Sequence, residues 1–159
     1  MENLFGNIYC IFESLFGSNL SLYLWGYNPD TESFTNPNIF NLIGLIIVSI
    51  TLLIVLGYYY VFSHPKYSRW WSWLLALLLN SGIALITGYW FVHSKYIHGF
   101  IPDSLLRQVD EDGNTIAMMI GDSNIFGFGV TNFFVAAGFF LLFTLLFKWW
   151  SPDAKHVPF

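Results

Sequence analysis

Residues 39–62 read IFNLIGLIIVSITLLIVLGYYYVF, a long apolar run without a single charged side chain. A helix needs about 20 mostly apolar residues to cross the hydrocarbon core of a bilayer. Two further uncharged runs of similar length follow, at 70–92 and at 125–147. Each is too long and too uniformly apolar for an amphipathic soluble helix, and none alternates as a strand of a membrane barrel does. The runs therefore predict an all-α membrane protein with three transmembrane helices.

The overall composition agrees with this prediction. Of the 159 residues, 55% are hydrophobic and only 10% are charged, whereas a soluble domain carries about 25% charged residues. A soluble chain of this size could not bury so much apolar surface in its own core, so we expect the lipid bilayer to cover it. The formal net charge of −4 leaves little to neutralise phosphates and argues against a nucleic-acid partner.

The apolar runs divide the chain into seven parts. The predicted parts are an N-terminal interfacial segment with a connector (1–36), a first transmembrane helix (37–62), a cytoplasmic loop (63–69), a second transmembrane helix (70–93), an outer acidic loop (94–124), a third transmembrane helix (125–148) and a cytoplasmic tail (149–159).

The positions of the basic residues predict the orientation in the membrane. Four of the six Lys and Arg residues lie in or beside the loop at 63–69 and the C-terminal tail, and only two lie in the loop at 94–124. Because positive residues concentrate on the cytoplasmic side, we expect the N-terminus outside and the C-terminus in the cytoplasm. The localisation that fits is a multi-pass protein of a bacterial inner membrane or an organellar inner membrane.

The N-terminal segment allows two interpretations. Leu4, Ile8, Ile11, Phe12 and Leu15 recur at helical spacing, which is typical of an amphipathic helix that lies in the membrane interface. A fourth transmembrane helix over residues 3–25 is the alternative. That alternative would bury the single acidic residue of the segment, at a cost of about 2.5 kcal/mol or more at mid-bilayer.

The outer loop contains a turn signal between two apolar runs. Asp112-Gly113 separates residues 105–109 from residues 115–120, and Asp-Gly in this setting is typical of a β-hairpin. A helix followed by a strand is the alternative. The second run includes Met118 and Met119, and we expect a protein partner or the membrane surface to cover it.

We find no catalytic, cofactor or metal site in the sequence, and we expect a protein that is not an enzyme. The acids at 110–112 and Asp122 lack the ligand spacing of a calcium-binding EF-hand. His93 and His98 are five residues apart and do not stack on one helix face. Residues 127–129 read GFG but lack the Thr-Val pair that precedes this sequence in a potassium filter. We expect these glycines to mark a flexible start of the third helix.

Polar and small residues stand out within the second and third apolar runs. An unpartnered carboxamide in hydrocarbon is costly, so it should face another helix, and small residues four apart let a neighbouring backbone approach. Ionisable residues are absent from all three runs, which argues against ion-coupled transport by this chain alone. The candidate helix–helix or pore-lining residues are Asn80, Ser81, Ala84, Gly88, Thr131 and Asn132.

Three functions remain open at this point. The first is a non-catalytic small integral membrane subunit that packs in a larger membrane complex, in a scaffold or accessory role. The second is a homo-oligomeric pore or channel-forming effector, lined by the polar residues of the second and third helices. The third is a membrane-bound binding or immunity protein that acts through its acidic outer loop. The expected partners are the lipid bilayer and either other membrane subunits or copies of the chain itself.

Overall fold

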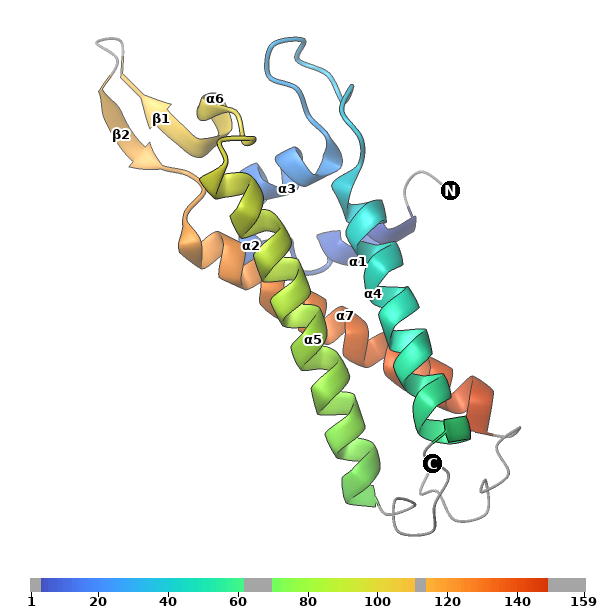
Figure 1. Cartoon of the computed structure of the whole chain (residues 1–159). Helices are drawn as coiled ribbons and strands as arrows, with labels where there is room; N and C mark the ends of the chain where they lie inside the picture. Colours follow the sequence, from blue (N-terminus) through green and yellow to red (C-terminus); the bar gives the residue numbers. More distant parts are fainter. Residues whose placement is uncertain (1–3, 62–69, 111–113, 149–159) are drawn as a thin grey trace.

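Three long helices form the body of the protein in a computed structural model that describes residues 4–61, 70–110 and 114–148 (Figure 1). They are α4 (Ile39–Leu56), α5 (Trp70–Ile97) and α7 (Asp122–Phe147), and a π-helical turn, η1 (Gly57–Val61), continues α4. Within the described ranges, three helices are long and apolar enough to cross a membrane. This confirms the prediction of three such helices. The loop at 63–69 and the tail at 149–159 lie outside the described residues.

The helix ends depart slightly from the predicted segments because polar residues extend and cap them. Asn38 precedes α4, and its side chain accepts a hydrogen bond from the backbone N–H of Asn41 at 3.2 Å. Helix α7 begins at Asp122, where the side chain of Asn124 accepts a bond from the N–H of Gly121 at 3.1 Å. Side-chain caps of this kind satisfy backbone donors that the first turn leaves free.

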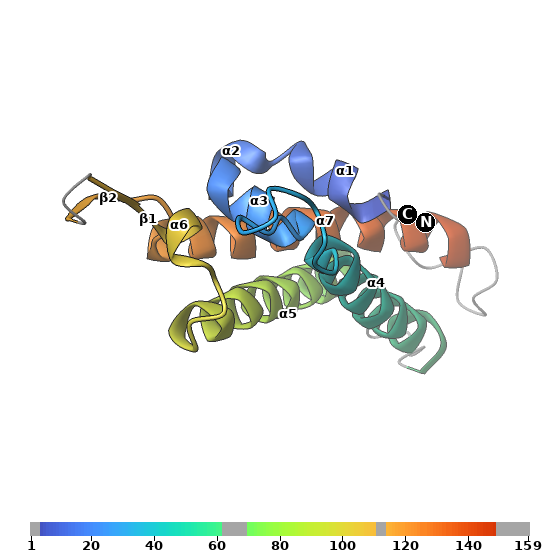
Figure 2. The same cartoon turned by 90° about the horizontal axis from the view of Figure 1, so that it is seen from above.

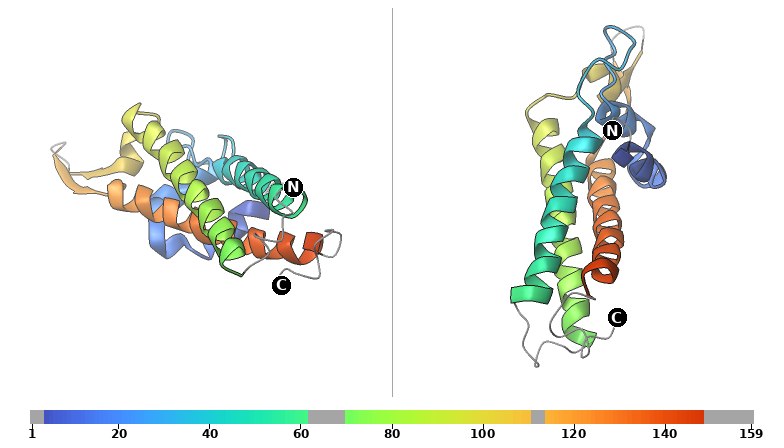
Figure 3. Two further views of the ribbon diagram at one scale, coloured as in Figure 1. Left: turned by 60° about the horizontal axis from the view of Figure 1, so that its bottom comes forward. Right: turned by 90° about the vertical axis from the view of Figure 1, so that its right-hand side faces the viewer.

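The three long helices do not form a parallel bundle. Helix α7 crosses behind both α5 and α4, and its most extensive contact is with α5 (Figures 1 and 3). Helix α4 packs mainly on α7 and touches α5 less. Seen from above, the N-terminal helices lie on the side of α7 that faces away from α5 (Figure 2).

The N-terminal segment folds as three short helices, α1 (Leu4–Cys10), α2 (Glu13–Phe16) and α3 (Ser18–Trp25), rather than as one amphipathic helix. The chain breaks at Gly17, where φ is 84°, a conformation that only glycine adopts readily. Asn124 of α7 lies beside this break and donates a hydrogen bond to the carbonyl of Phe16 at 3.0 Å. None of the three helices has the length needed to cross a membrane.

A short antiparallel hairpin follows α5, as one of the two interpretations of the outer loop predicted. Helix α6 (Asp103–Leu106) leads into β1 (Arg107–Val109), which pairs with β2 (Thr115–Met118). Arg107 pairs with Met118 and Val109 pairs with Thr115, with an irregularity between Gln108 and Val109. The hairpin and the connector between α3 and α4 lie at the same end of the molecule (Figure 1). The turn residues Asp112 and Gly113 fall outside the described part.

The buried apolar side chains form two clusters along the helices. The larger one joins the N-terminal helices to α4 and α7, where the ring of Phe40 lies 5.1 Å from that of Tyr9 and 6.1 Å from that of Phe128, measured between centroids. The smaller one lies at the other end of the bundle, where the ring of Trp73 lies 5.9 Å from that of Phe140. Helices α1–α3 therefore supply part of the core that the long helices share.

Candidate functional site

The polar residues of α5 and α7 lie in the interior of a single chain. Of the six candidate residues predicted from the sequence, Asn80, Ser81, Thr131 and Asn132 are 0% exposed, and Ala84 and Gly88 are buried with them. We call these six residues together with Tyr9 the polar seam. A pore between subunits would need the polar members on the outer surface of the chain. The structure instead encloses them.

Asn132 is the best-bonded residue of the polar seam. Its Oδ1 accepts a hydrogen bond from the hydroxyl of Tyr9 at 2.6 Å, and its Nδ2 donates to the carbonyl of Phe128 at 2.7 Å. Tyr9 is also fully buried, and this burial raises the pKa of its phenol above the ordinary value. The phenol therefore stays protonated and remains a donor. A carboxamide in the middle of an apolar helix is thus satisfied by a residue from α1.

Small residues bring α5 and α7 close together at this level. A Cβ atom placed on Gly88 would overlap the side chain of Asn132. One turn earlier on α7, a Cβ atom on Gly129 would lie 3.1 Å from the carbonyl oxygen of Leu85. Ala84 completes this edge of α5 and is 3% exposed. The small residues therefore set the closest approach of the two backbones, as small residues commonly do between membrane helices.

Asn80 is less well bonded than Asn132. Its Nδ2 donates to the carbonyl of Ala136 at 3.3 Å, whereas its Oδ1 has no hydrogen-bond partner among the described residues. The hydroxyls of Ser81 and Thr51 also lack a partner in the described part of the chain. The hydroxyl of Thr131 donates a hydrogen bond to the carbonyl of Gly127 in the same helix at 3.0 Å. The polar seam is therefore fully satisfied at Asn132 and only partly satisfied at Asn80.

The glycines at 127 and 129 lie inside α7 and do not form a flexible start of the helix. A Cβ atom on Gly127 would overlap the backbone carbonyl of Leu15 in α2. These two glycines therefore allow the backbone of α7 to pack closely against α2 and α5.

The hairpin of β1 and β2 contrasts with the polar seam, because every residue of both strands is exposed. Val109, Ile116 and Met118 are 53%, 61% and 60% exposed. The base of the hairpin is fixed to the bundle: Ile120 is fully buried, and the N–H of Met119 donates to the carbonyl of Leu106 at 2.8 Å. The strands therefore project from this base (Figure 1), and their apolar side chains are uncovered.

The two histidines near the end of α5 have separate surroundings. His93 stacks on Tyr89 with ring centroids 5.1 Å apart, whereas the exposed His98 lies beside Phe100 at 6.3 Å. Across residues 4–61, 70–110 and 114–148, no three His, Cys, Asp or Glu side chains gather in a way that could hold a metal ion.

Tyr9 is the member of the polar seam that the sequence did not reveal. It falls on the buried side of the N-terminal segment together with Phe16, Leu20 and Leu24. A polar aromatic side chain among apolar residues at roughly helical spacing is the signal that could have found it.

Comparisons of the chain with protein-family models, with curated proteins and with solved structures found no match. The function is therefore argued from the geometry of the polar seam and of the outer hairpin.

Proposed function

We propose that the protein is a non-catalytic small integral membrane subunit that packs in a larger membrane complex and binds a partner subunit through its outer hairpin. The observation that carries this proposal is the exposure of Val109, Ile116 and Met118 on strands that project from the bundle. Exposed apolar patches on a protein surface mark interaction sites. A two-stranded hairpin without further cover is also only marginally stable in water.

The hairpin end of the molecule is the outer face in this proposal. Four of the six Lys and Arg residues lie in or beside the loop at 63–69 and the C-terminal tail, on the opposite side of the predicted transmembrane helices from the hairpin. Their position favours the cytoplasm for that side. Helices α1–α3 then lie at the outer membrane interface. Ile11 and Leu15, which are 75% and 44% exposed, would enter lipid there, and the membrane is a bacterial or organellar inner membrane.

The expected partner is the outer domain of another membrane protein. Both strands have free outer edges in the two-stranded sheet, and an added strand from a partner would supply main-chain hydrogen bonds. Exposed Val and Met side chains beside that edge would gain apolar cover at the same time. The enclosed polar seam supports a scaffold role, because its polar residues are buried within the chain and Asn132 is hydrogen-bonded to Tyr9 there.

The experiment that tests this proposal is mass measurement of the intact assembly. The tagged full-length chain is purified in a mild detergent from the cells that make it naturally, and native mass spectrometry is applied. We expect a mass above the 18.3 kDa of one chain that includes a different polypeptide. The double variant Ile116→Glu/Met118→Glu should release the partner.

A matched control adds two charges to the same hairpin without removing apolar side chains. Gln108→Glu/Thr115→Glu alters two exposed polar strand residues and should retain at least part of the partner. A monomer or a homo-oligomer in the wild-type sample would contradict the proposal. Release of the partner by the control as readily as by the Ile116→Glu/Met118→Glu variant would contradict the role of the apolar residues.

A further inference from the structure

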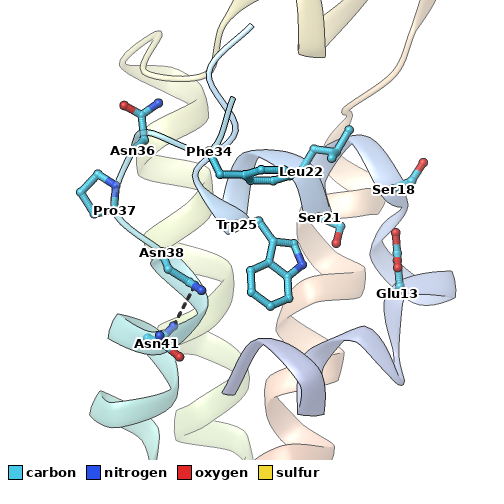
Figure 4. Close-up of a pocket in the computed structure, with 10 residues that line it drawn as sticks. All are labelled: Glu13, Ser18, Ser21, Leu22, Trp25, Phe34, Asn36, Pro37, Asn38 and Asn41. Atoms are coloured by element: carbon cyan, nitrogen blue, oxygen red, sulfur yellow. Dashed lines mark hydrogen bonds between the residues drawn. The ribbon is translucent and has the colours of Figure 1, made fainter. Parts of the chain in front are cut away.

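A cleft of about 880 Å³ opens between α2, α3, the connector and the start of α4 (Figure 4). It is separate from the hairpin and from the polar seam. Its walls combine one carboxylate, two hydroxyls, amides from the connector and two aromatic rings. The residues on which the inference rests are Glu13, Ser18, Ser21, Trp25, Phe34 and Asn41.

The indole of Trp25 is held rigidly at the centre of this cleft. One part of the ring packs on α1, where a Cβ atom on Gly6 would overlap it, and the ring of Phe40 meets it edge to face at 5.6 Å. Its nitrogen faces the side where Ser21 and Glu13 lie (Figure 4). The indole N–H has no hydrogen-bond partner in the described part of the chain, so it is a free donor on a fixed aromatic surface.

Ser21 supplies a second free polar group at the same place. Its side chain is buried, with the residue only 3% exposed, and it points into the cleft (Figure 4). No group in the described ranges bonds its hydroxyl. The hydroxyl faces the open cleft, where it can bond water or a ligand. The hydroxyl is therefore positioned for a polar group that enters from the cleft.

The charge of the cleft favours a cation. Glu13 forms no ion pair with any of the described residues, and the cleft walls contain no Lys or Arg. Asp30 and Glu32 are exposed in the connector and do not line the cleft. Acidic groups without basic neighbours attract positive ligands and repel anions.

We propose that this cleft binds an organic ammonium group of the amino-alcohol class, such as choline or ethanolamine. The ammonium lies against Glu13 and over the face of Trp25, because a cation is attracted to an aromatic face as well as to a carboxylate. The ligand hydroxyl or ether oxygen bonds Ser21. A lipid headgroup and a free amino alcohol share this chemistry, and the site does not depend on the partner of the hairpin.

The first test measures binding to the full-length chain in a non-ionic maltoside detergent and phosphate buffer, which avoids amine buffers. The probes are choline and 3,3-dimethylbutan-1-ol, an uncharged molecule of almost the same shape. Titration calorimetry should show saturable choline binding and an affinity at least about tenfold lower for the neutral probe, which corresponds to about 1.4 kcal/mol. Equal affinity for the two probes, or no saturable choline binding, would overturn the proposal.

Two variants inside the cleft and one control outside it locate the binding. Glu13→Gln keeps the shape of the side chain and should lower choline affinity about tenfold without a change in melting temperature. Glu32→Gln makes the same change in the exposed connector and should leave the affinity within about twofold. Ser21→Ala offers a second variant inside the cleft and should weaken choline but not tetramethylammonium, which has no hydroxyl. An unchanged choline affinity in Glu13→Gln would contradict the site.

A last arm separates the two sources of the ligand. Native mass spectrometry of the chain in nanodiscs with and without phosphatidylethanolamine tests retention of a lipid. Lipid that is retained by the wild type, displaced by free ethanolamine and lost in Glu13→Gln identifies a headgroup site. Absence of retained lipid together with choline binding identifies a site for the free amino alcohol. Saturable binding of glucose, a neutral polyol, with no binding of either amine would overturn the proposal.

Discussion

The polar seam and the outer hairpin place side chains in opposite ways. In the polar seam, Asn80 and Asn132 are polar residues within apolar helices of membrane-spanning length, and each donates a hydrogen bond to a backbone carbonyl of α7. In the hairpin, Ile116 and Met118 are apolar residues outside the long helices, and they are 61% and 60% exposed. Contacts within the chain enclose both Asn80 and Asn132 and satisfy Asn132, whereas no contact within the described residues covers the apolar side chains of the strands.

This difference separates residues that build the fold from residues that face a partner. The bond between Tyr9 and Asn132 joins residues 123 positions apart in the sequence, so it fixes α1 against α7. No comparable contact covers the strands in the described part of the chain. We therefore expect changes in the polar seam to alter stability and changes in the hairpin to alter assembly.

Among changes in the long helices, the largest effect on stability is expected at Gly127. Gly127→Ala would place a methyl group against the carbonyl of Leu15 in α2, and overpacking against backbone falls at the upper end of the usual range, at about 3 kcal/mol or more. Gly138→Ala on the same helix is the matched control, because no atom lies within 4 Å of its Cβ position. The control should be neutral or slightly stabilising. Unfolding in mixed detergent and SDS micelles measures both, and equal effects would refute the close approach of α2.

A somewhat smaller effect is expected at Asn132. Asn132→Leu removes two hydrogen bonds and leaves the buried hydroxyl of Tyr9 without its acceptor, at a cost of about 2–3 kcal/mol. Asn80→Leu should cost less than about 1 kcal/mol, because its single bond is long and its Oδ1 is already unpartnered. The same micelle titration compares the two variants. A larger loss of stability in Asn80→Leu than in Asn132→Leu would contradict the prediction that Asn132 stabilises the fold more than Asn80.

Alkaline pH tests the contribution of Tyr9. Its folded-state pKa is raised by burial, so its contribution to stability is complete below the unfolded pKa of about 10 and is lost as pH rises above that value. The melting temperature of the wild type should therefore fall more steeply than that of Tyr9→Phe above about pH 10. Below that pH, Tyr9→Phe should be less stable by about 1 kcal/mol. Parallel curves would show that Tyr9 is not buried as a neutral donor.

The three long helices could be predicted from sequence because a charge-free run of about 20 residues has few physical solutions other than a membrane helix. The hairpin could be predicted because Asp112-Gly113 between apolar runs is a local signal. Both predictions depend on residues close together in the chain. The positions of Asn80 and Asn132 on the buried sides of their helices followed in the same way from the cost of a lone carboxamide in lipid.

The enclosure of the polar seam within one chain could not be predicted locally. It depends on Tyr9, which reaches α7 because the chain breaks at Gly17 and turns around Asn124. The cleft beside α2 and α3 could not be predicted for the same reason, because its lining residues Glu13, Trp25 and Asn41 come from three different helices. Contacts between segments far apart in sequence leave no periodic signal.

The smallest effect on stability is expected in the hairpin, although the expected effect on assembly there is large. Met118→Glu replaces a side chain that is 60% exposed, and surface substitutions of this kind usually change stability by no more than about 0.5 kcal/mol. Ile120→Glu, two residues later, is the contrasting change. Ile120 is fully buried at the base of the hairpin, and a charge there should lower stability by about 3 kcal/mol or more. Micelle titration of both variants measures where the rigid base ends. If Met118→Glu destabilised the chain as much as Ile120→Glu, the strands would belong to the fold of the chain, and the division between a structural seam and a surface for a partner would fail.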